Sequence, residues 1–281
     1  MKMFLRQLGG ELRKLFARKR TYIGFAAFLV VELIVLGLLR LPRVQRGLER
    51  LLEGAGYAAS DYLSGLTLGL MIMLSTVFLL GALYLALVAG DVVSKEIEDG
   101  TLRMMLCRPA SRGRILFLKF CACVIYTAVL TVYIALTALA AGYLHAGGGG
   151  LFVFAPTEGI FAIYEAGRGI GRIAMGVPFL VLSLCTITTI GFFFSCLKMK
   201  PAAATIATLS VLFVDTILKN IPFFSGIRDW FLTAKMSAWA LVFEYRIPWE
   251  IMLEQYAWLA ALNVTLLVLG YLAFSSRDFK S

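Results

Sequence analysis

Long uninterrupted hydrophobic runs alternate along the chain with shorter polar stretches that carry most of the charges. Each run has roughly 18–20 residues or more, the length that a helix needs to cross a hydrocarbon core about 30 Å thick. None of the runs alternates between apolar and polar residues as a membrane β-barrel strand does. The pattern therefore predicts an all-α, polytopic membrane protein with six transmembrane helices. The six runs are 22–39, 66–89, 120–142, 177–197, 202–218 and 256–274.

Composition agrees with this fold class. Of the 281 residues, 60% are hydrophobic and 16% are charged, and the mean hydropathy is +0.85. A water-soluble domain has about 45–50% apolar and about 25% charged residues, so this chain has too few polar side chains to cover itself in water. We interpret residues 1–281 as a single transmembrane domain.

The loop charges indicate how the chain crosses the membrane. Lys and Arg residues number 17 on the side of the two termini and 10 on the other side. Because cytosolic loops carry the excess of basic residues, we expect both termini to be cytosolic. The net charge of +10 then faces anionic lipid headgroups, and nucleic acid is not an expected partner.

Two amphipathic stretches lie outside the hydrophobic runs. Residues 1–20 place apolar side chains at helical spacing between Lys and Arg residues. This predicts a cytosolic interface helix that leads into the first span, and a disordered basic flank is the alternative. The outer loop 41–65 contains a shorter stretch of the same kind.

The remaining two outer segments differ in composition. Residues 145–176 contain a run of four glycines and Pro156, so we expect mostly loop there. Residues 220–255 are rich in Trp, Phe and Tyr, which favour the headgroup level of a bilayer. Pro222 and Pro248 bracket an expected interfacial helix in this segment.

Little in the sequence indicates enzymatic chemistry. The single histidine, His145, has no companion ligand, so we expect no metal site. The sequence contains neither a GxSxG nucleophile turn nor a GxxxxGK[ST] phosphate loop, so the chain is not expected to hydrolyse ATP or to be an enzyme by itself. The five cysteines fall in helices or on the cytosolic side, where we expect no disulfide.

Two acidic residues lie inside predicted spans. An ionised carboxylate at bilayer depth costs at least about 2.5–3.5 kcal/mol, so each should be paired, protonated or facing an aqueous cavity. Asp215 precedes Lys219 by four residues, a spacing that allows an ion pair near the outer surface. Glu32 has no basic residue within a turn and is the better candidate for a functional or interface group, with a tolerated polar residue as the alternative.

The long cytosolic segment 90–119 is the most informative part of the sequence. Ser94 is expected to cap a short helix that Gly100 ends. Residues 101–106 are expected to form a second short helix, and Ser111 to cap the run that enters the membrane. Two short amphipathic helices at a membrane surface would form a docking site for a partner.

The order of residues in this segment resembles the permease subunits of type-2 ABC exporters. The typical loop has an acidic residue, then Gly-Thr-Leu, a pair of Leu residues, Pro, Arg and Lys. The residues that match are Glu96, Gly100, Thr101, Leu102, Met105, Leu106, Pro109, Arg112 and Lys119, with Met105 where Leu is usual. The six spans, the basic interface helix and the aromatic outer segment extend the resemblance over the whole chain.

The resemblance implies a transmembrane subunit that exports or translocates a substrate, which the sequence does not identify. Two permease chains would form a homodimer, and a dimer of separate ATPase subunits would hold ATP and Mg²⁺ and dock on the interface helix and the loop. A periplasmic or accessory protein is a further possible partner. The implied docking residues are Glu96, Asp99, Gly100, Thr101, Leu102, Arg103, Pro109 and Arg112.

Two other functions are compatible with a membrane protein of this size. An ion-coupled secondary transporter would use Glu32 and Asp215 as coupling sites, but it should have inverted repeats and broken helices, which we do not find in the sequence. A membrane scaffold that assembles a partner complex without transport is the second alternative. ATP hydrolysis by a co-purified complex would distinguish it from a transporter.

Overall fold

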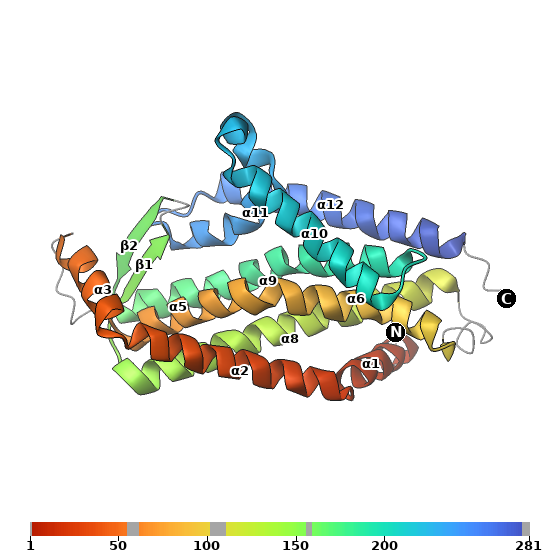
Figure 1. Ribbon diagram of the computed structural model, residues 1–281, viewed down its shortest axis with the longest axis horizontal. Coiled ribbons are helices and arrows are strands. Elements are labelled where there is room, and N and C mark those ends of the chain that lie inside the picture. Colours follow the sequence, from red (N-terminus) through yellow and green to blue (C-terminus); the bar gives the residue numbers. More distant parts are fainter. Residues whose placement is uncertain (1, 55–61, 102–110, 156–158, 277–281) are drawn as a thin grey trace.

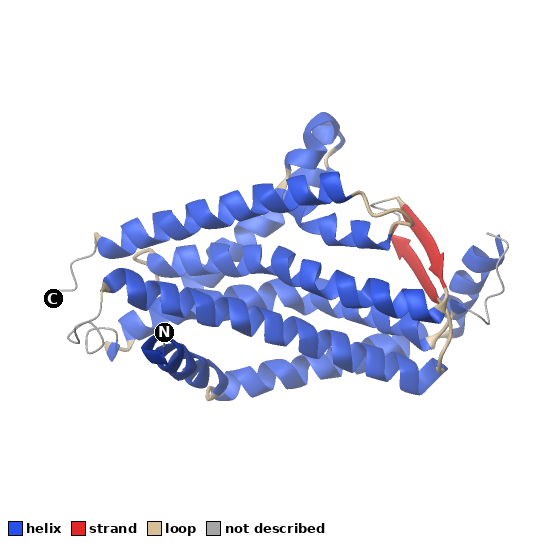
Figure 2. Ribbon diagram, turned by 180° about the vertical axis from the view of Figure 1, so that it is seen from behind, coloured by secondary structure: helices blue, strands red, loops and turns tan. Residues whose placement is uncertain are grey.

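The computed structural model describes residues 2–54, 62–101, 111–155 and 159–276 and is an elongated bundle of helices with a β-hairpin at one end (Figure 1). Helix α1 and the end of the last helix lie together at the opposite end of the bundle (Figures 1 and 2). We call these the termini end and the hairpin end. An even number of spans requires the first and the last helix to have their outer ends on the same side, as they do here.

Six helical segments of the described residues are long and apolar enough to cross a membrane, which confirms the predicted number of spans. They are α2 (Lys19–Leu39), the continuous segment α5, η1 and α6 (Gly65–Thr76, Val77–Gly81 and Ala82–Glu98), α8 (Arg112–Ala146), α9 (Ala166–Cys196), α10 (Pro201–Asn220) and α12 (Trp249–Ser275). Within the second span, η1 is a π-helical turn.

The second span extends further than its hydrophobic run, because α6 continues to Glu98. The prediction that Ser94 caps a new helix is therefore wrong. The Ser94 hydroxyl donates to the carbonyl of Gly90 one turn earlier, and its backbone N–H donates to Oγ of Ser195, 2.9 Å away in α9. By contrast, Ser111 does precede α8 and accepts a hydrogen bond from the Arg114 N–H at 3.4 Å.

Helices α8 and α9 form the centre of the bundle. In their most apolar stretches, 56% and 61% of the residues are buried, against 22%, 22% and 17% in α2, α10 and α12. The rest of the chain therefore leaves most of the apolar surface of the outer helices uncovered. Glycines allow the closest approach in the centre: a Cβ on Gly142 of α8 would lie 2.6 Å from the Gly69 N of α5. Small residues at such positions are typical of membrane helix interfaces.

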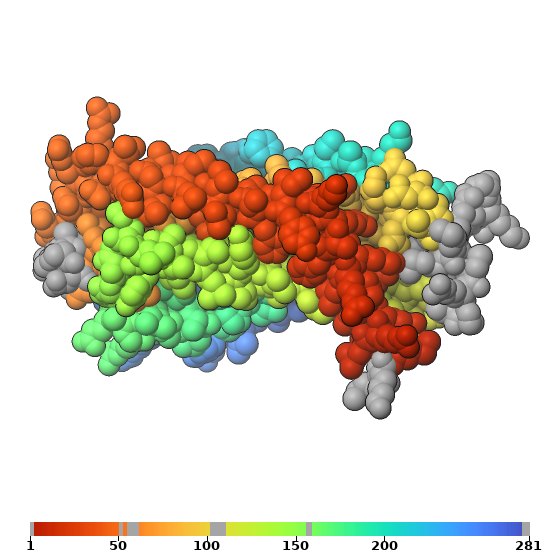
Figure 3. Space-filling model, turned by 90° about the horizontal axis from the view of Figure 1, so that it is seen from below, coloured from red at the N-terminus to blue at the C-terminus, as the bar shows by residue number. Residues whose placement is uncertain are grey.

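Two amphipathic helices lie outside the bundle core. Helix α1 (Lys2–Phe16) forms within the predicted interface segment and runs across the bundle, as the space-filling view shows (Figure 3). Its junction with α2 is fixed by the Thr21 hydroxyl, which donates to the Leu15 carbonyl at 2.6 Å. Helix α3 (Pro42–Gly54) occupies the amphipathic stretch of the first outer loop.

The segment 145–176 is not mostly loop, so this prediction is wrong. Strands β1 (Leu151–Ala155) and β2 (Ile160–Tyr164) form an antiparallel hairpin, with Leu151 opposite Tyr164. Helix α9 then begins at Ala166, eleven residues before the predicted span. The segment also contains β-branched and aromatic residues that favour strands, and the prediction gave more weight to its many glycines.

The aromatic segment 220–255 contains three short helical turns instead of one interfacial helix. They are η3 (Pro222–Trp230), α11 (Leu232–Met236) and η4 (Ser237–Phe243). The first and the third are 3-10 helices, which rarely extend far because their hydrogen-bond geometry is poor.

Candidate functional site

The end of α6 forms an exposed polar corner at the termini end. The side chains of Glu98 and Asp99 are each 50% exposed and lie 4.0 and 3.9 Å from the ammonium of Lys95. Gly100 follows with φ of +70°, in the left-handed region that favours glycine. The chain therefore turns sharply here and leaves two carboxylates available to a partner.

A buried charge cluster lies behind this corner. Lys119 of α8 has a side chain only 1% exposed, and its ammonium lies 2.9 Å from Glu11 Oε2 and 2.7 Å from Glu96 Oε2. Lys14 lies 2.7 Å from Glu11 Oε1 and 3.6 Å from Glu96 Oε1. These four side chains, which we call the charge cluster, join α1, α6 and α8 and sum to zero charge.

The lysines of the cluster shift the pKa of the Glu11 carboxyl, which lies on the interface helix. Burial by itself would raise the pKa of the Glu11 carboxyl. The ammonium groups of Lys119 and Lys14 outweigh burial and hold the pKa below its ordinary value of 4.5. Glu11 is therefore ionised at neutral pH and binds both lysines as a carboxylate.

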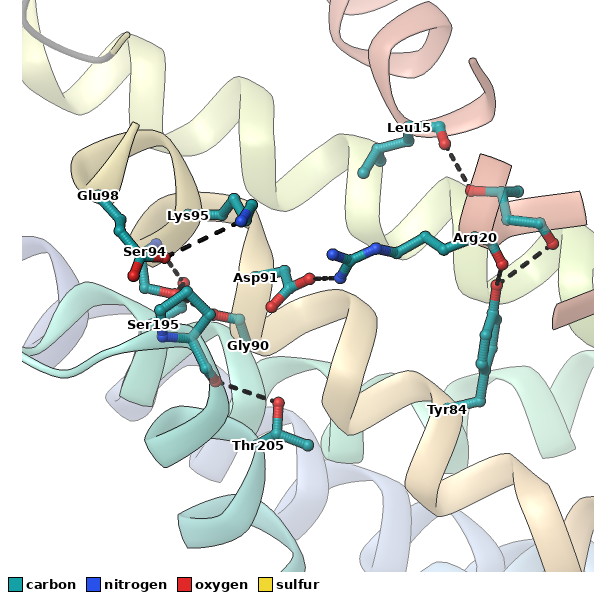
Figure 4. A network of polar contacts seen from close by, with 12 residues as sticks. Leu15, Arg20, Tyr84, Gly90, Asp91, Ser94, Lys95, Glu98, Ser195 and Thr205 are labelled. Atoms are coloured by element: carbon teal, nitrogen blue, oxygen red, sulfur yellow. Dashed lines mark hydrogen bonds and ion pairs between the residues drawn. The ribbon is translucent and has the colours of Figure 1, made fainter. Parts of the chain in front are cut away.

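A second charged contact fixes the start of α2. The Arg20 guanidinium forms an ion pair with the buried Asp91 carboxylate of α6 (Figure 4). The Tyr84 hydroxyl donates toward the carbonyls of Arg20 and Thr21, at 3.2 and 3.3 Å. Helices α1, α2, α6 and α8 are thus connected by charged or polar contacts within a few turns of one another.

The model of the ABC-2 family transporter protein matches residues 11–279. The chain belongs to this family. No curated protein matches the chain. As an ABC-2 permease, it is a multi-pass protein of the cell membrane and the membrane component of an ABC transporter, a class of subunit that is generally non-catalytic.

The structure divides the sequence-predicted docking residues of this permease into four groups, the fourth of which is Glu96 alone. Asp99, Gly100 and Thr101 lie together at the exposed corner, where the Thr101 hydroxyl donates to the Glu96 carbonyl at 3.3 Å. Arg112 begins α8 and donates to the Ser275 carbonyl of α12 at 2.8 Å. Leu102, Arg103 and Pro109 lie outside the described residues.

Glu96 differs from the expectation of an exposed docking group. It is buried, and its carboxylate binds the two lysines of the charge cluster. Glu96 and Lys119, the first and last charged residues of the loop motif, are therefore partners in one ion pair. Glu96 was expected on a partner surface because nothing in the sequence indicates that the two ends of the motif meet.

Glu32 faces the protein interior, where its side chain is 1% exposed. Its carboxyl Oε1 lies 2.9 Å from the Thr137 hydroxyl of α8. This contact connects α2 to the central helix. The position satisfies the expectation that an acidic residue within a span has a polar partner.

Asp215 has a structural partner other than Lys219. Its carboxylate accepts hydrogen bonds from the backbone N–H groups of Leu232 and Thr233, at 3.0 and 2.7 Å, and from the Thr233 hydroxyl at 2.6 Å. It thereby caps the first turn of α11. No ion pair between Asp215 and Lys219 is present among the described residues.

A cavity of about 640 Å³ lies at the hairpin end, between β2, the start of α9 and the chain before α12. Its walls carry tyrosine rings and two arginines, none of which the sequence analysis selected. The residues concerned are Tyr62, Tyr164, Arg168, Arg172 and Tyr245.

Membership of Glu11, Lys14 and Lys119 in one cluster was not predicted from the sequence. The spacing of Glu11 and Lys14, three residues apart on an amphipathic helix, is a signal for a local ion pair. Nothing local indicates that Lys119, more than a hundred residues later, completes the cluster.

Proposed function

We propose that the chain is the membrane-spanning half of an ATP-driven transporter whose separate ATPase subunits dock at the termini end. The termini end would face the cytosol, as the excess of Lys and Arg in its loops favours. ATP and Mg²⁺ would be held by the ATPase subunits. A second copy of the permease would complete the transmembrane pathway, and the substrate, exported or translocated, is unidentified.

The proposed docking site is supported by one observation: the exposed corner lies directly in front of the charge cluster. A partner that binds Asp99 and Gly100 pushes on the end of α6. The cluster connects that end to α1 through Glu11 and to α8 through Lys119. Buried ion pairs are costly to separate, so the three helices should move as one body.

The two alternative functions find less support. A secondary transporter that uses Asp215 for ion coupling requires a free carboxylate, whereas Asp215 caps α11 with three hydrogen bonds. A scaffold without transport requires no connection between the docking corner and the membrane helices. Vanadate-sensitive ATP hydrolysis by the co-purified complex separates the scaffold from the transporter.

The docking corner is tested with Asp99→Arg and Gly100→Val in the full chain. The first reverses an exposed charge, and the second forces a β-branched residue into a left-handed conformation that costs about 1–2 kcal/mol. Both lie outside the spans, so we expect membrane insertion to survive while co-purification of the ATPase subunit and coupled hydrolysis fall.

The matched control is Glu53→Arg, an exposed charge reversal on α3 at the hairpin end. It should leave ATPase binding unchanged. If Asp99→Arg and Gly100→Val bind the ATPase subunit as well as wild type does, the docking site lies elsewhere.

A further inference from the structure

A short helical segment projects sideways from the bundle, in the half of the molecule that contains the hairpin (Figure 1). This segment is η3, and its aromatic side chains point outward: Phe223 is 85% exposed and Trp230 is 71% exposed. Lys235 of α11 is buried and holds its ammonium 5.9 Å above the Trp230 ring. Exposed Phe and Trp rings beside a lysine suit the headgroup level of a bilayer.

Residues of α10, η3, α11, η4 and α12 line a cavity of about 290 Å³ at this projection. Three of its lining side chains are charged, namely Lys219, Arg228 and Asp229. None of the three forms an ion pair with another residue in the described part of the chain. Gln255 lines the same cavity, and its buried Oε1 accepts no hydrogen bond from the described residues. The cavity therefore offers two cations and two acceptors without internal partners.

The helices beside the cavity are apolar on their outer surface. Ile217 of α10 is 45% exposed, and Ile251 and Leu253 of α12 are 52% and 62% exposed. Ile251 is also part of the cavity wall, so the polar site continues directly onto apolar surface. A ligand that satisfies both regions is an amphiphile with a polar head and apolar chains.

We propose that this cavity binds the headgroup of phosphatidylethanolamine, with its acyl chains along α10 and α12. Lys219 and Arg228 match the negative phosphodiester. The primary ammonium of ethanolamine has N–H groups that can donate hydrogen bonds to the Asp229 carboxylate and to the Gln255 Oε1. Choline has no N–H donor, so phosphatidylcholine would leave both acceptors unsatisfied. This site goes beyond the proposed transport function and does not depend on the ATPase.

Native mass spectrometry of the purified, delipidated full chain in detergent tests the proposal, with the two lipids added at matched acyl chains. We expect phosphatidylethanolamine to bind about tenfold more tightly than phosphatidylcholine, the effect of about one charge-assisted hydrogen bond. Free phosphoethanolamine and inorganic phosphate should compete poorly because they lack acyl chains. Equal retention of the two lipids overturns the proposal, and so does displacement by free phosphoethanolamine at the same concentration as lipid, which would indicate a soluble ligand.

Variants separate the two halves of the headgroup. Lys219→Gln with Arg228→Gln should weaken both lipids. Asp229→Leu with Gln255→Leu removes both acceptors, so it should abolish the preference for phosphatidylethanolamine and leave phosphatidylcholine binding intact. The control pair Arg43→Gln with Arg46→Gln removes two exposed arginines of α3 and should change neither affinity. The unfolding temperature without lipid establishes that each variant is folded. Folded variants that keep wild-type affinities and preference contradict the proposal.

Discussion

The two ends of the bundle are held together by different kinds of contact. At the termini end, charged side chains meet each other in the charge cluster and in the pair between Arg20 and Asp91. At the hairpin end, several polar side chains meet backbone carbonyls, and the Arg40 guanidinium contacts the His145 ring. Arg172 donates to the carbonyls of Val242 and Tyr245 at 2.7 and 2.9 Å, and the Tyr164 hydroxyl donates to a carbonyl at 2.7 Å.

This difference bears on which end can transmit a movement. Contacts to backbone carbonyls and close glycine packing fix one local geometry, since any shift loses the hydrogen bond or creates a clash. An ion-paired cluster between three helices holds them to one another and allows the group to move as a unit. We therefore expect the termini end to carry motion and the hairpin end to resist it.

The largest expected effect is loss of the central ammonium of the cluster. Lys119→Met leaves Glu11 and Glu96 buried without their main partner, which should destabilise the folded state by about 3–5 kcal/mol. Thermal unfolding of the purified permease measures the change. Lys95→Met is the control, since its exposed pairs are worth about 1 kcal/mol or less. Equal effects of the two substitutions would show that the cluster does not hold the termini end.

The hairpin end is tested by substitution of Gly142, which lies near the end of α8 and packs against the start of α5. Gly142→Ala places a Cβ 2.6 Å from the Gly69 N, so we expect a cost of about 1–3 kcal/mol from overpacking. A Cβ added at Gly37 in α2 would have no neighbouring atom within 4 Å, so Gly37→Ala should change stability little. An unfolding temperature for Gly142→Ala equal to that of the control would contradict the close packing of α5 on α8.

Removal of the α11 cap should have a smaller effect, because Asp215 fixes only one short helix. Asp215→Ala loses three hydrogen bonds at the start of α11 and should cost about 1 kcal/mol, within the range of other N-cap replacements. Hydrogen exchange of the Leu232 and Thr233 amides reports the loss locally. Unchanged protection of these two amides would show that Asp215 does not cap α11.

The smallest effect is on pH dependence at the termini end. The folded-state pKa of Glu11 is below its ordinary value of 4.5, so its stabilising contribution is complete above about 4.5 and is lost as pH falls through the lower folded value. A spin label at Gly10 on α1 should stay immobile from pH 7 to about 4.5 and become mobile at more acid pH. Increased mobility already near pH 6 would contradict the ionised cluster.

The sequence predicted the number of spans and their approximate positions because the hydrophobic runs are long and the lipid constraint is strong. It failed where a new helix was expected to begin after Ser94, because α6 continues without interruption to Glu98. Asp91 and Glu96 lie inside α6 because Arg20 and Lys119, from distant segments, neutralise them. Pairings of this kind depend on tertiary packing and leave no local pattern.

The candidate site, like the fold, was predicted only in part from the sequence. Gly100 was correctly expected to be left-handed, because its position after a helix end favours that conformation. The burial of Glu96 was not predictable, since an amphipathic segment does not reveal which neighbour covers its polar face. The hairpin was missed because the glycine run in the same segment outweighed its strand-forming residues.

The central claim is that α1 and α6 move as one body. Pulsed electron–electron double resonance, which measures the distance between two spin labels, tests it most directly. Spin labels at Gly10 on α1 and Lys95 near the end of α6 are placed on one permease copy that is diluted with unlabelled copies, so that only the distance within one chain is measured. The measurement is made in vesicles with the ATPase subunits bound, before and after trapping with ATP and vanadate. We predict a narrow distance distribution that does not change on trapping in the wild type and that broadens in Lys119→Met. A wild-type distance that shifts on trapping, or a Lys119→Met distribution identical to that of the wild type, would contradict the account.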